Sequence, residues 1–183
     1  MELKAYRKPD VPRDIAAQIR SYVRIQWPFL DARGGALWDV PADSPARTFV
    51  VIDGDKLISH AEANFRTVDQ GGRAYNVGGL SAVFTFPAYR GGGFAREVVC
   101  KATAFLDTSD ADLAMLFCGE PLHGLYASYG WDAIESAEIL HGDPAAPTAY
   151  DGNFVMMRFI SDNGRAARRS FESQPVYVGK RTW

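Results

Sequence analysis

Apolar residues in the first half of the chain change from helical spacing to the pattern of strands. A short apolar run at residues 3–6 predicts a first strand, and Pro12 then opens a helical repeat that ends before Pro28. Three strands are predicted to follow, at residues 47–52, 57–68 and 73–86. The turns between them are too short for a crossover, so these strands should form an antiparallel meander. Gly78 and Gly79 interrupt the third strand, which indicates a bulge or the close approach of another group.

The second half returns to helical spacing around one fully apolar run. Residues 94–107 predict a helix, and residues 113–118, all of them apolar, predict a strand that is buried on both faces. A short helix over residues 121–129 should follow, with Gly130 at its C-terminal end. The change of period between these segments predicts helices that alternate with buried strands.

The last part of the chain gives weaker signals. Two strands are expected at residues 135–140 and 153–160, joined by a proline-rich connection, and we expect no clear element beyond residue 160. A basic patch lies there, which we interpret as a solvated face: Arg165, Arg168 and Arg169. Earlier in the chain, residues 31–46 carry two glycines and two prolines and predict a long irregular loop, a kind of segment that often binds ligands.

Composition and charge limit the classes of function. The 183 residues suit one domain, and the element order predicts a single α+β (mixed α/β) domain over residues 1–183. A net charge of −2 argues against a general attraction to nucleic acid. The start of the chain lacks the apolar core of a signal peptide, and no apolar run is long enough to span a membrane, so we expect a cytoplasmic protein. Cys100 and Cys118 lack metal-ligand spacing, so we expect two reduced core thiols and no metal site.

A glycine-rich segment between the third meander strand and the next helix carries the strongest chemical signal. Gly91, Gly92 and Gly93 allow a sharp turn in which several backbone N–H groups point into one hollow. The helix that follows adds its own unpaired amides and the positive end of its dipole, and Arg90 adds a full charge. This arrangement suits a pyrophosphate. The sequence lacks the GxxxxGK[ST] motif of P-loop proteins and has no GxGxxG after its first strand, which disfavours both nucleotide-binding folds.

Two stretches taken together resemble the GNAT acetyltransferases. The first, Arg90-Gly-Gly-Gly93-Phe-Ala95, resembles the family's R/Q-x-x-G-x-G/A signature. The second runs from Leu125 to Trp131 (LYASYGW) and resembles the family's stretch in which a Tyr precedes a Gly-aromatic pair. The helix, buried strand and helix between the two also match. The resemblance implies the GNAT fold, a central, mostly antiparallel twisted sheet with flanking helices, and acetyl-CoA as co-substrate.

The resemblance also implies roles for individual residues. In the family, the strand before the loop separates from its neighbour, and the pantetheine arm pairs with positions that match Val83, Phe84 and Thr85 here, with the acetyl group near the backbone of Val83. The expected pyrophosphate-binding residues are Arg90, Gly91, Gly92, Gly93, Phe94, Ala95 and Arg96. Tyr126 matches the residue that protonates the departing thiolate. The amine would attack the thioester directly, so Cys118 is not expected to be a nucleophile.

Residues from about 75 to 183 further resemble the aminoglycoside 2'-N-acetyltransferases. The similarity rests on the LYAS run, the Gly-Trp pair after it, a Pro/Thr-rich stretch, the turn at Asp151 and the terminal Trp183. The residues expected to contact the acceptor are Asp39, Ser81, Ala82, Tyr150, Asp151 and Trp183. The partners implied are a small-molecule amine, with no nucleic acid and no membrane, and a homodimer stays open.

Two departures from that family change the expected acceptor. The family has a Glu where Ser81 stands. It also has several acids just before the last strand, where this chain has only Asp151, and one acid near the C-terminus, where this chain has Lys180 and Arg181. Polycationic aminoglycosides need anionic partners. A less cationic drug with its own carboxylate, such as kasugamycin, is therefore favoured.

Replacement bases and other acceptors stay open at this point. The candidate bases are Glu120, Glu62 (which shares a strand face with His60), Asp39 and the Trp183 carboxylate. We take Tyr126, Glu120 and Trp183 as the expected catalytic set. Alternative functions are acetylation of another small amine, a lysine or a peptide N-terminus, acyl transfer from a carrier protein as in the nodulation acyltransferases, and a non-catalytic acetyl-CoA sensor.

Overall fold

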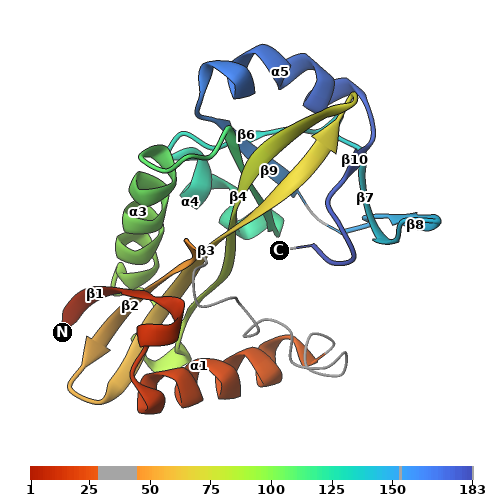
Figure 1. Cartoon of the computed structure of the whole chain (residues 1–183). Helices are drawn as coiled ribbons and strands as arrows, with labels where there is room; N and C mark the ends of the chain where they lie inside the picture. Colours follow the sequence, from red (N-terminus) through yellow and green to blue (C-terminus); the bar gives the residue numbers. More distant parts are fainter. Residues whose placement is uncertain (29–44, 153, 183) are drawn as a thin grey trace. The chain divides into compact units, whose positions relative to one another are not determined.

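The computed structural model describes residues 1–28, 45–152 and 154–182 (Figure 1). Within these residues the helices are α1 (Arg13–Gln26), α3 (Phe94–Asp107), α4 (Glu120–Ala127) and α5 (Asp162–Ser173), with short 3-10 turns η1 (Lys8–Asp10) and η2 (Pro87–Tyr89). The strands are β1 (Glu2–Arg7), β2 (Arg47–Asp53), β3 (Lys56–Gln70), β4 (Arg73–Thr85), β5 (Leu113–Cys118), β6 (Asp132–Ala133), β7 (Ile139–Asp143), β8 (Ala146–Ala149), β9 (Phe154–Phe159) and β10 (Val176–Tyr177). One sheet has the order β1-β2-β3-β4-β5-β9-β6 and a second has the order β10-β7-β8.

The first of two compact units comprises residues 1–64 and 82–102. Its strands β1, β2 and β3 pair antiparallel, and the β2–β3 turn places Gly54 at φ +60°, where a side chain would be strained. The helix α1 buries one face, because its apolar positions recur at helical spacing. The core that α1 forms with the strands comprises Val11, Ile15, Ile19, Tyr22, Val23, Val50, Ile52, Leu57 and Phe84.

The second unit comprises residues 65–81 and 103–183. The strand β5 pairs parallel with β4 from Val77↔Leu113 to Gly79↔Met115, and antiparallel with β9 along its whole length. Helix α5 lies across the outer part of the β3–β4 hairpin (Figure 1), where Phe171 packs edge-on against Tyr75 with ring centroids 5.3 Å apart. The core of this unit comprises Val68, Tyr75, Val77, Leu113, Met115, Ile134, Ile139, Val155, Met157, Ala167, Phe171, Val176 and Val178.

Most elements expected from the sequence are confirmed. The first strand, the first helix, the meander strands and the helix 94–107 are present within a residue or two, and β5 has the predicted bounds. The fold is the expected mixed α/β arrangement. The predicted loop at 31–46 falls almost wholly outside the described residues.

The C-terminal part required four corrections. Residues beyond 160 form α5 and β10, where no element was expected, because α5 has few apolar positions. The strand expected at 135–140 lies at Ile139–Asp143, and part of the proline-rich connection pairs with it as β8. A short strand β6 was missed. Helix α4 ends at Ala127 instead of residue 129, and the turn that follows places Gly130 at φ +77°.

The irregular position of β4 is Ala82 instead of the glycine pair. The strand runs unbroken through Gly78, and a Cβ on Gly78 would lie 2.5 Å from the Leu106 side chain, so the expected close approach is confirmed there. Ala82 has φ 49°, in the left-handed region that costs a non-glycine residue about 1–2 kcal/mol. Surrounding contacts must therefore hold this backbone in place.

One partly buried arginine fixes the C-terminal segment of the second unit. The Arg66 guanidinium donates from Nη1 to the carbonyl oxygens of Val178 (2.5 Å) and Arg181 (2.6 Å). Burial lowers the pKa of Arg66 to about 10. Gly179 lies between these two acceptors with φ +100°. The last described residues are thus held through their main chain.

Candidate active site

The glycine loop before α3 has the backbone conformation that only glycine adopts easily. Gly91 and Gly93 both have φ +83°, and a Cβ on either would meet no atom within 4 Å. Gly92 differs, because its Cβ would lie 2.6 Å from the Phe94 ring. The space in front of Gly91 and Gly93 is therefore open, while the loop packs against itself at Gly92.

Several backbone amides at this loop have no acceptor in the described part of the chain. The amides of Arg96 and Glu97 bond to the carbonyl of Gly93. Those of Gly91, Gly93, Phe94 and Ala95 donate to none of the described residues. Orphan amides at a helix N-terminus bind anions, because they align with the positive end of the helix dipole. This hollow can hold the oxygens of a pyrophosphate.

Arg90 connects the loop to the end of β4 and to α1. Its Nε donates to the Thr85 carbonyl at 3.3 Å, and its Nη2 donates to the Tyr22 hydroxyl at 3.1 Å. The Tyr22 ring in turn stacks on Phe84, with ring centroids 4.1 Å apart. These contacts connect α1, the end of β4 and the loop within one unit.

The end of β4 is bonded to β3 through side chains. His60 Nδ1 lies 2.7 Å from the carbonyl oxygen of Ala82, and the Ser59 hydroxyl lies 2.9 Å from both the Phe84 carbonyl and Thr85 Oγ1. His60 is fully buried, which lowers its pKa to about 4, although the bond to Ala82 opposes this change. The imidazole is therefore neutral at physiological pH. Because a carbonyl only accepts, Nδ1 carries the proton.

Glu62 is not available as a catalytic base. Lys8 Nζ lies 2.5 Å from Glu62 Oε1, both side chains are 4% exposed, and Asn64 donates to the same oxygen at 3.0 Å. Burial raises the pKa of Glu62, while the Lys8 ammonium opposes that rise. A carboxylate engaged by a buried ammonium has a structural role. The expectation that Glu62 could serve as a base is therefore corrected.

Tyr126 lies on α4 in the second unit and is 4% exposed. Burial raises its pKa, with a smaller contribution from Cys118. Its hydroxyl makes no hydrogen bond to the described residues. A phenol in this environment keeps its proton and can give it only to a strongly basic partner.

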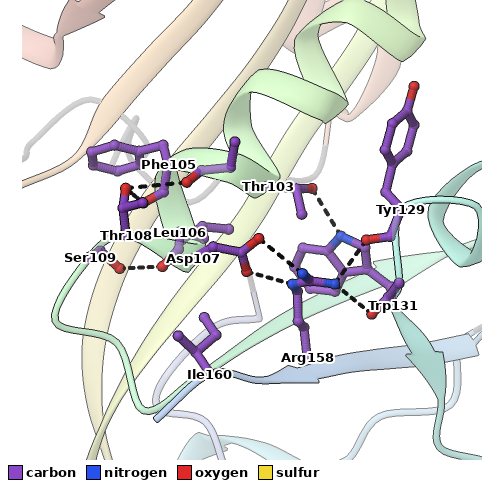
Figure 2. A network of polar contacts seen from close by, with 12 residues as sticks. Thr103, Phe105, Leu106, Asp107, Thr108, Ser109, Tyr129, Trp131, Arg158 and Ile160 are labelled. Atoms are coloured by element: carbon purple, nitrogen blue, oxygen red, sulfur yellow. Dashed lines mark hydrogen bonds and ion pairs between the residues drawn. The ribbon is translucent and has the colours of Figure 1, made fainter.

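The turn after Tyr126 is fixed by the network in Figure 2. Arg158 forms a fork on Asp107, with Nε–Oδ1 and Nη2–Oδ2 distances of 2.5 and 2.9 Å, and its Nη1 donates to the carbonyls of Tyr129 and Gly130, each at 2.9 Å. The buried Trp131 indole donates to Thr103 Oγ1 at 3.0 Å. A Cβ on Gly130 would lie 2.4 Å from the Arg158 guanidinium. The Gly-Trp pair thus positions the helix that carries Tyr126.

A cavity of about 370 Å³ lies in the second unit, beside the Tyr150–Gly152 segment. Its lining residues are Ile134, Glu135, Ala137, Ile139, Tyr150, Gly152, Phe154 and Val155. The Tyr150 ring packs edge-on against Phe117 at 4.7 Å. Among the described lining residues, Glu135 is the one that carries a carboxylate, and the others are mainly apolar or aromatic.

The sequence of this glycine loop and its neighbours identifies the family. The family model described as Acetyltransferase (GNAT) domain matches residues 16–134, which include the loop, α3, β5 and α4. The chain belongs to the GNAT acetyltransferase family. It is accordingly an acetyl-CoA-dependent N-acyltransferase, and the predicted co-substrate class is confirmed.

Solved structures show the same GNAT fold. YhbS of Escherichia coli, a GNAT N-acetyltransferase in complex with CoA, is 17% identical with a TM-score of 0.59, over 96% of this chain and 88% of that chain. Escherichia coli ElaA is 15% identical with a TM-score of 0.59, over 86% and 99%. A conserved protein of unknown function from Enterococcus faecalis V583 is 18% identical with a TM-score of 0.56; the match covers 73% of this chain but only 33% of that one. No curated protein matches the sequence.

The structure of this GNAT acetyltransferase gives the environment of the predicted site residues. The loop residues Arg90 to Arg96 and the strand residues Val83 to Thr85 lie in the first unit, although Phe84 points into the core. Ser81, in the second unit, is buried. Asp151 and Glu120 are exposed, while Tyr150 is partly buried. Asp39 and Trp183 lie outside the described residues.

Sequence reasoning missed some features of the site and misjudged one cysteine. Glu135 and the bond from His60 to Ala82 were not foreseen, since both depend on contacts between distant segments. Cys118 is buried as expected, but Cys100 is exposed on α3, so it is not a core thiol. In the described ranges, no group of three or more His, Cys, Asp or Glu could hold a metal ion. No helix among those residues is long and apolar enough to cross a membrane.

Proposed function

We propose that this GNAT enzyme acetylates an amine of a small molecule, specifically an aminoglycoside-type antibiotic of low positive charge, such as kasugamycin. The observation that carries the acetyl-CoA half of this proposal is the set of unsatisfied amides at the glycine loop. The observation that favours a weakly cationic acceptor is the cavity, whose described lining residues include one carboxylate, that of Glu135. A polycation would need more anionic partners than this lining supplies.

The co-substrate would be held mainly by backbone groups. We assign the pyrophosphate to the amides of Gly91, Gly93, Phe94 and Ala95, which are oriented by the positive φ of the two glycines and by the α3 dipole. The pantetheine arm would pair with the backbone of the β4 segment that includes Val83. Arg90 is engaged by Tyr22 and Thr85, so its proposed role is to hold the loop in shape.

The transfer would proceed by direct attack. The neutral amine forms the new C–N bond at the thioester carbonyl carbon, the C–S bond breaks, and the thiolate takes the proton of the Tyr126 hydroxyl. The raised pKa of Tyr126 keeps the phenol protonated at the start of each cycle, so its proton is available when the basic thiolate forms. The amine proton leaves to Glu120, which is exposed at the first turn of α4 and has no ion pair among the described residues. Tyr126 then regains its proton from water.

The acceptor is tested by measuring thiol release from acetyl-CoA against a panel of aminoglycosides that includes neamine-type drugs and kasugamycin. We expect turnover with the less cationic drug and weak or no turnover with the polycations. Glu135→Gln should raise KM for that drug, while Glu138→Gln, a neighbouring acid outside the cavity lining, should not. Faster turnover of the polycations would contradict the charge argument.

The proton donor is tested by Tyr126→Phe. This change should lower kcat by about 100- to 10,000-fold, the range for one general acid, and leave the affinity for CoA unchanged. Glu120→Gln should instead shift the acidic limb of the pH–rate profile. Binding of acetyl-CoA without turnover of any amine in the panel would favour the alternative of a non-catalytic sensor.

A further inference from the structure

We propose that His60 is a positioning residue that fixes the peptide bond between Ala82 and Val83, so that the Val83 N–H is directed at the thioester oxygen of bound acetyl-CoA. The inference rests on the proposed function, since it requires the acetyl group to lie beside Val83. All residues that carry the argument belong to the first unit.

The direction of the Val83 amide follows from the bond that His60 makes. The Nδ1–H of His60 donates to the Ala82 carbonyl at 2.7 Å, so this oxygen points toward the imidazole. The described residues contain no cis peptide bond. In a planar trans peptide the C=O and N–H groups point in opposite directions. The Val83 N–H therefore points away from His60, on the opposite side of the strand from the histidine.

The conformation of Ala82 needs such support. Its φ of 49° is unfavourable for a residue with a side chain, and strained backbone of this kind persists only where surrounding contacts determine it. The next residues along the strand are fixed as well, because Ser59 bonds to the Phe84 carbonyl and to Thr85. The irregular turn of the strand is thus held from β3 at consecutive positions.

The imidazole is itself held rigidly. It is fully buried and stacks on Phe84, with ring centroids 5.1 Å apart and an interplanar angle of 26°. The Lys8–Glu62 ion pair lies on the same face of β3, two residues along. An oxyanion donor contributes to catalysis only when it is oriented in advance, so a rigid support behind the Val83 amide has a direct chemical use.

The hydrogen bond from His60 to Ala82 can be removed separately from the volume of the ring, because the second ring nitrogen makes no hydrogen bond of its own to the described residues. Nε2 is buried and has no hydrogen-bond partner in the described part of the chain. The single polar contact of the ring is therefore the one to Ala82. An asparagine can place its amide nitrogen near the position of Nδ1, whereas a leucine fills similar volume without a donor. The pair of variants therefore isolates the hydrogen bond.

The experiment compares wild type, His60→Asn and His60→Leu by isotope-edited infrared spectroscopy of bound acetyl-CoA that carries a heavy carbon at the thioester carbonyl. In wild type, the carbonyl stretch should shift to lower frequency on binding, as expected for a hydrogen-bonded carbonyl. His60→Leu should lose this shift, and His60→Asn should keep most of it. With an acceptor amine, His60→Leu should lower kcat by about 10- to 100-fold, up to the loss seen for one oxyanion donor. Calorimetry with CoA, which lacks the acetyl group, should give the same Kd for all three proteins.

Three outcomes would overturn the inference. An unchanged carbonyl shift in His60→Leu would show that the amide is oriented without the histidine. Equal losses in His60→Asn and His60→Leu would show that the ring, not its hydrogen bond, matters. Loss of CoA affinity in parallel with activity would show a purely structural role. Failure of wild type to bind acetyl-CoA would instead refute the proposed function, so the two failures are distinguishable.

Discussion

Replacement of Gly93 by alanine should weaken CoA binding through backbone strain alone. The residue has φ +83°, and a new Cβ would meet no atom within 4 Å, so no steric clash in the protein contributes. An L-residue in this region is disfavoured by about 1–2 kcal/mol. The free enzyme would relieve the strain by moving residue 93 to negative φ, which reorients the amides of Phe94 and Ala95. Binding must restore the strained loop, so Kd should rise by about 5- to 30-fold.

The assay is calorimetry with CoA at fixed ionic strength, since phosphate contacts are sensitive to salt. Gly54→Ala is the matched control, because Gly54 also has positive φ (+60°) and open space around its missing Cβ, but it lies in the β2–β3 hairpin turn. That variant should lose stability and keep its affinity for CoA. If Gly93→Ala binds CoA as wild type does, or if Gly54→Ala weakens binding equally, the strain argument is refuted.

Further predictions concern stability. Gly164→Ala would place a Cβ 1.9 Å from the Asp112 carbonyl oxygen, and denaturant unfolding should show the protein destabilised by about 3–5 kcal/mol. In the same assay Gly124→Ala, whose new Cβ would meet no atom within 4 Å, should stabilise helix α4 by about 0.5–1 kcal/mol. The pKa of His60 is about 4 in the folded protein and 6.5 in the unfolded chain, so the neutral imidazole contributes its full share to the free energy of unfolding above pH 6.5. That free energy should fall by about 3 kcal/mol as the pH drops toward 4. In unfolding titrations, His60→Asn should flatten this pH dependence. Lys8→Met would leave Glu62 buried without its cation and should destabilise the protein by about 3–5 kcal/mol, most strongly at high pH, because burial raises the pKa of Glu62. The double variant Lys8→Met with Glu62→Leu should recover much of this loss. Equal losses in the single and the double variant would contradict the argument that the unpaired carboxylate causes it.

Elements that follow from local chemistry could be predicted from the sequence. The hairpin at Gly54 and the buried strand β5 are each specified by a few adjacent residues, and the structure places both as expected. The glycine loop is similar, since glycine is the residue that adopts positive φ easily, and Gly91 and Gly93 both do so. Helix α5 was missed because its buried positions, Gly164, Ala167 and Phe171, include only one large apolar residue. Its clearest local signal was Ser161, whose side chain caps the helix by accepting from the Gly164 amide.

Features that depend on distant segments could not be predicted in this way. Glu62 was a candidate base on the sequence alone, yet it is bound by Lys8, which is 54 residues away along the chain. The strain at Ala82 has no signature in an alanine, whereas Gly78 and Gly79 drew attention to a part of the strand that is regular. The cavity lies where residues 134–139 meet residues 150–152 and 154–155, and only the tertiary structure brings these segments together.

The hydrogen bonds from Arg66 to the main chain of the C-terminal segment affect which sequence changes that segment can accept during evolution. The guanidinium binds the main-chain carbonyl oxygens of Val178 and Arg181, and these two hydrogen bonds do not depend on the side chain at either position. Mutations at positions such as Lys180 can therefore accumulate while the path of the chain is retained. A lineage that keeps the arginine on β3 can vary the exposed side chains of this segment without losing these two hydrogen bonds.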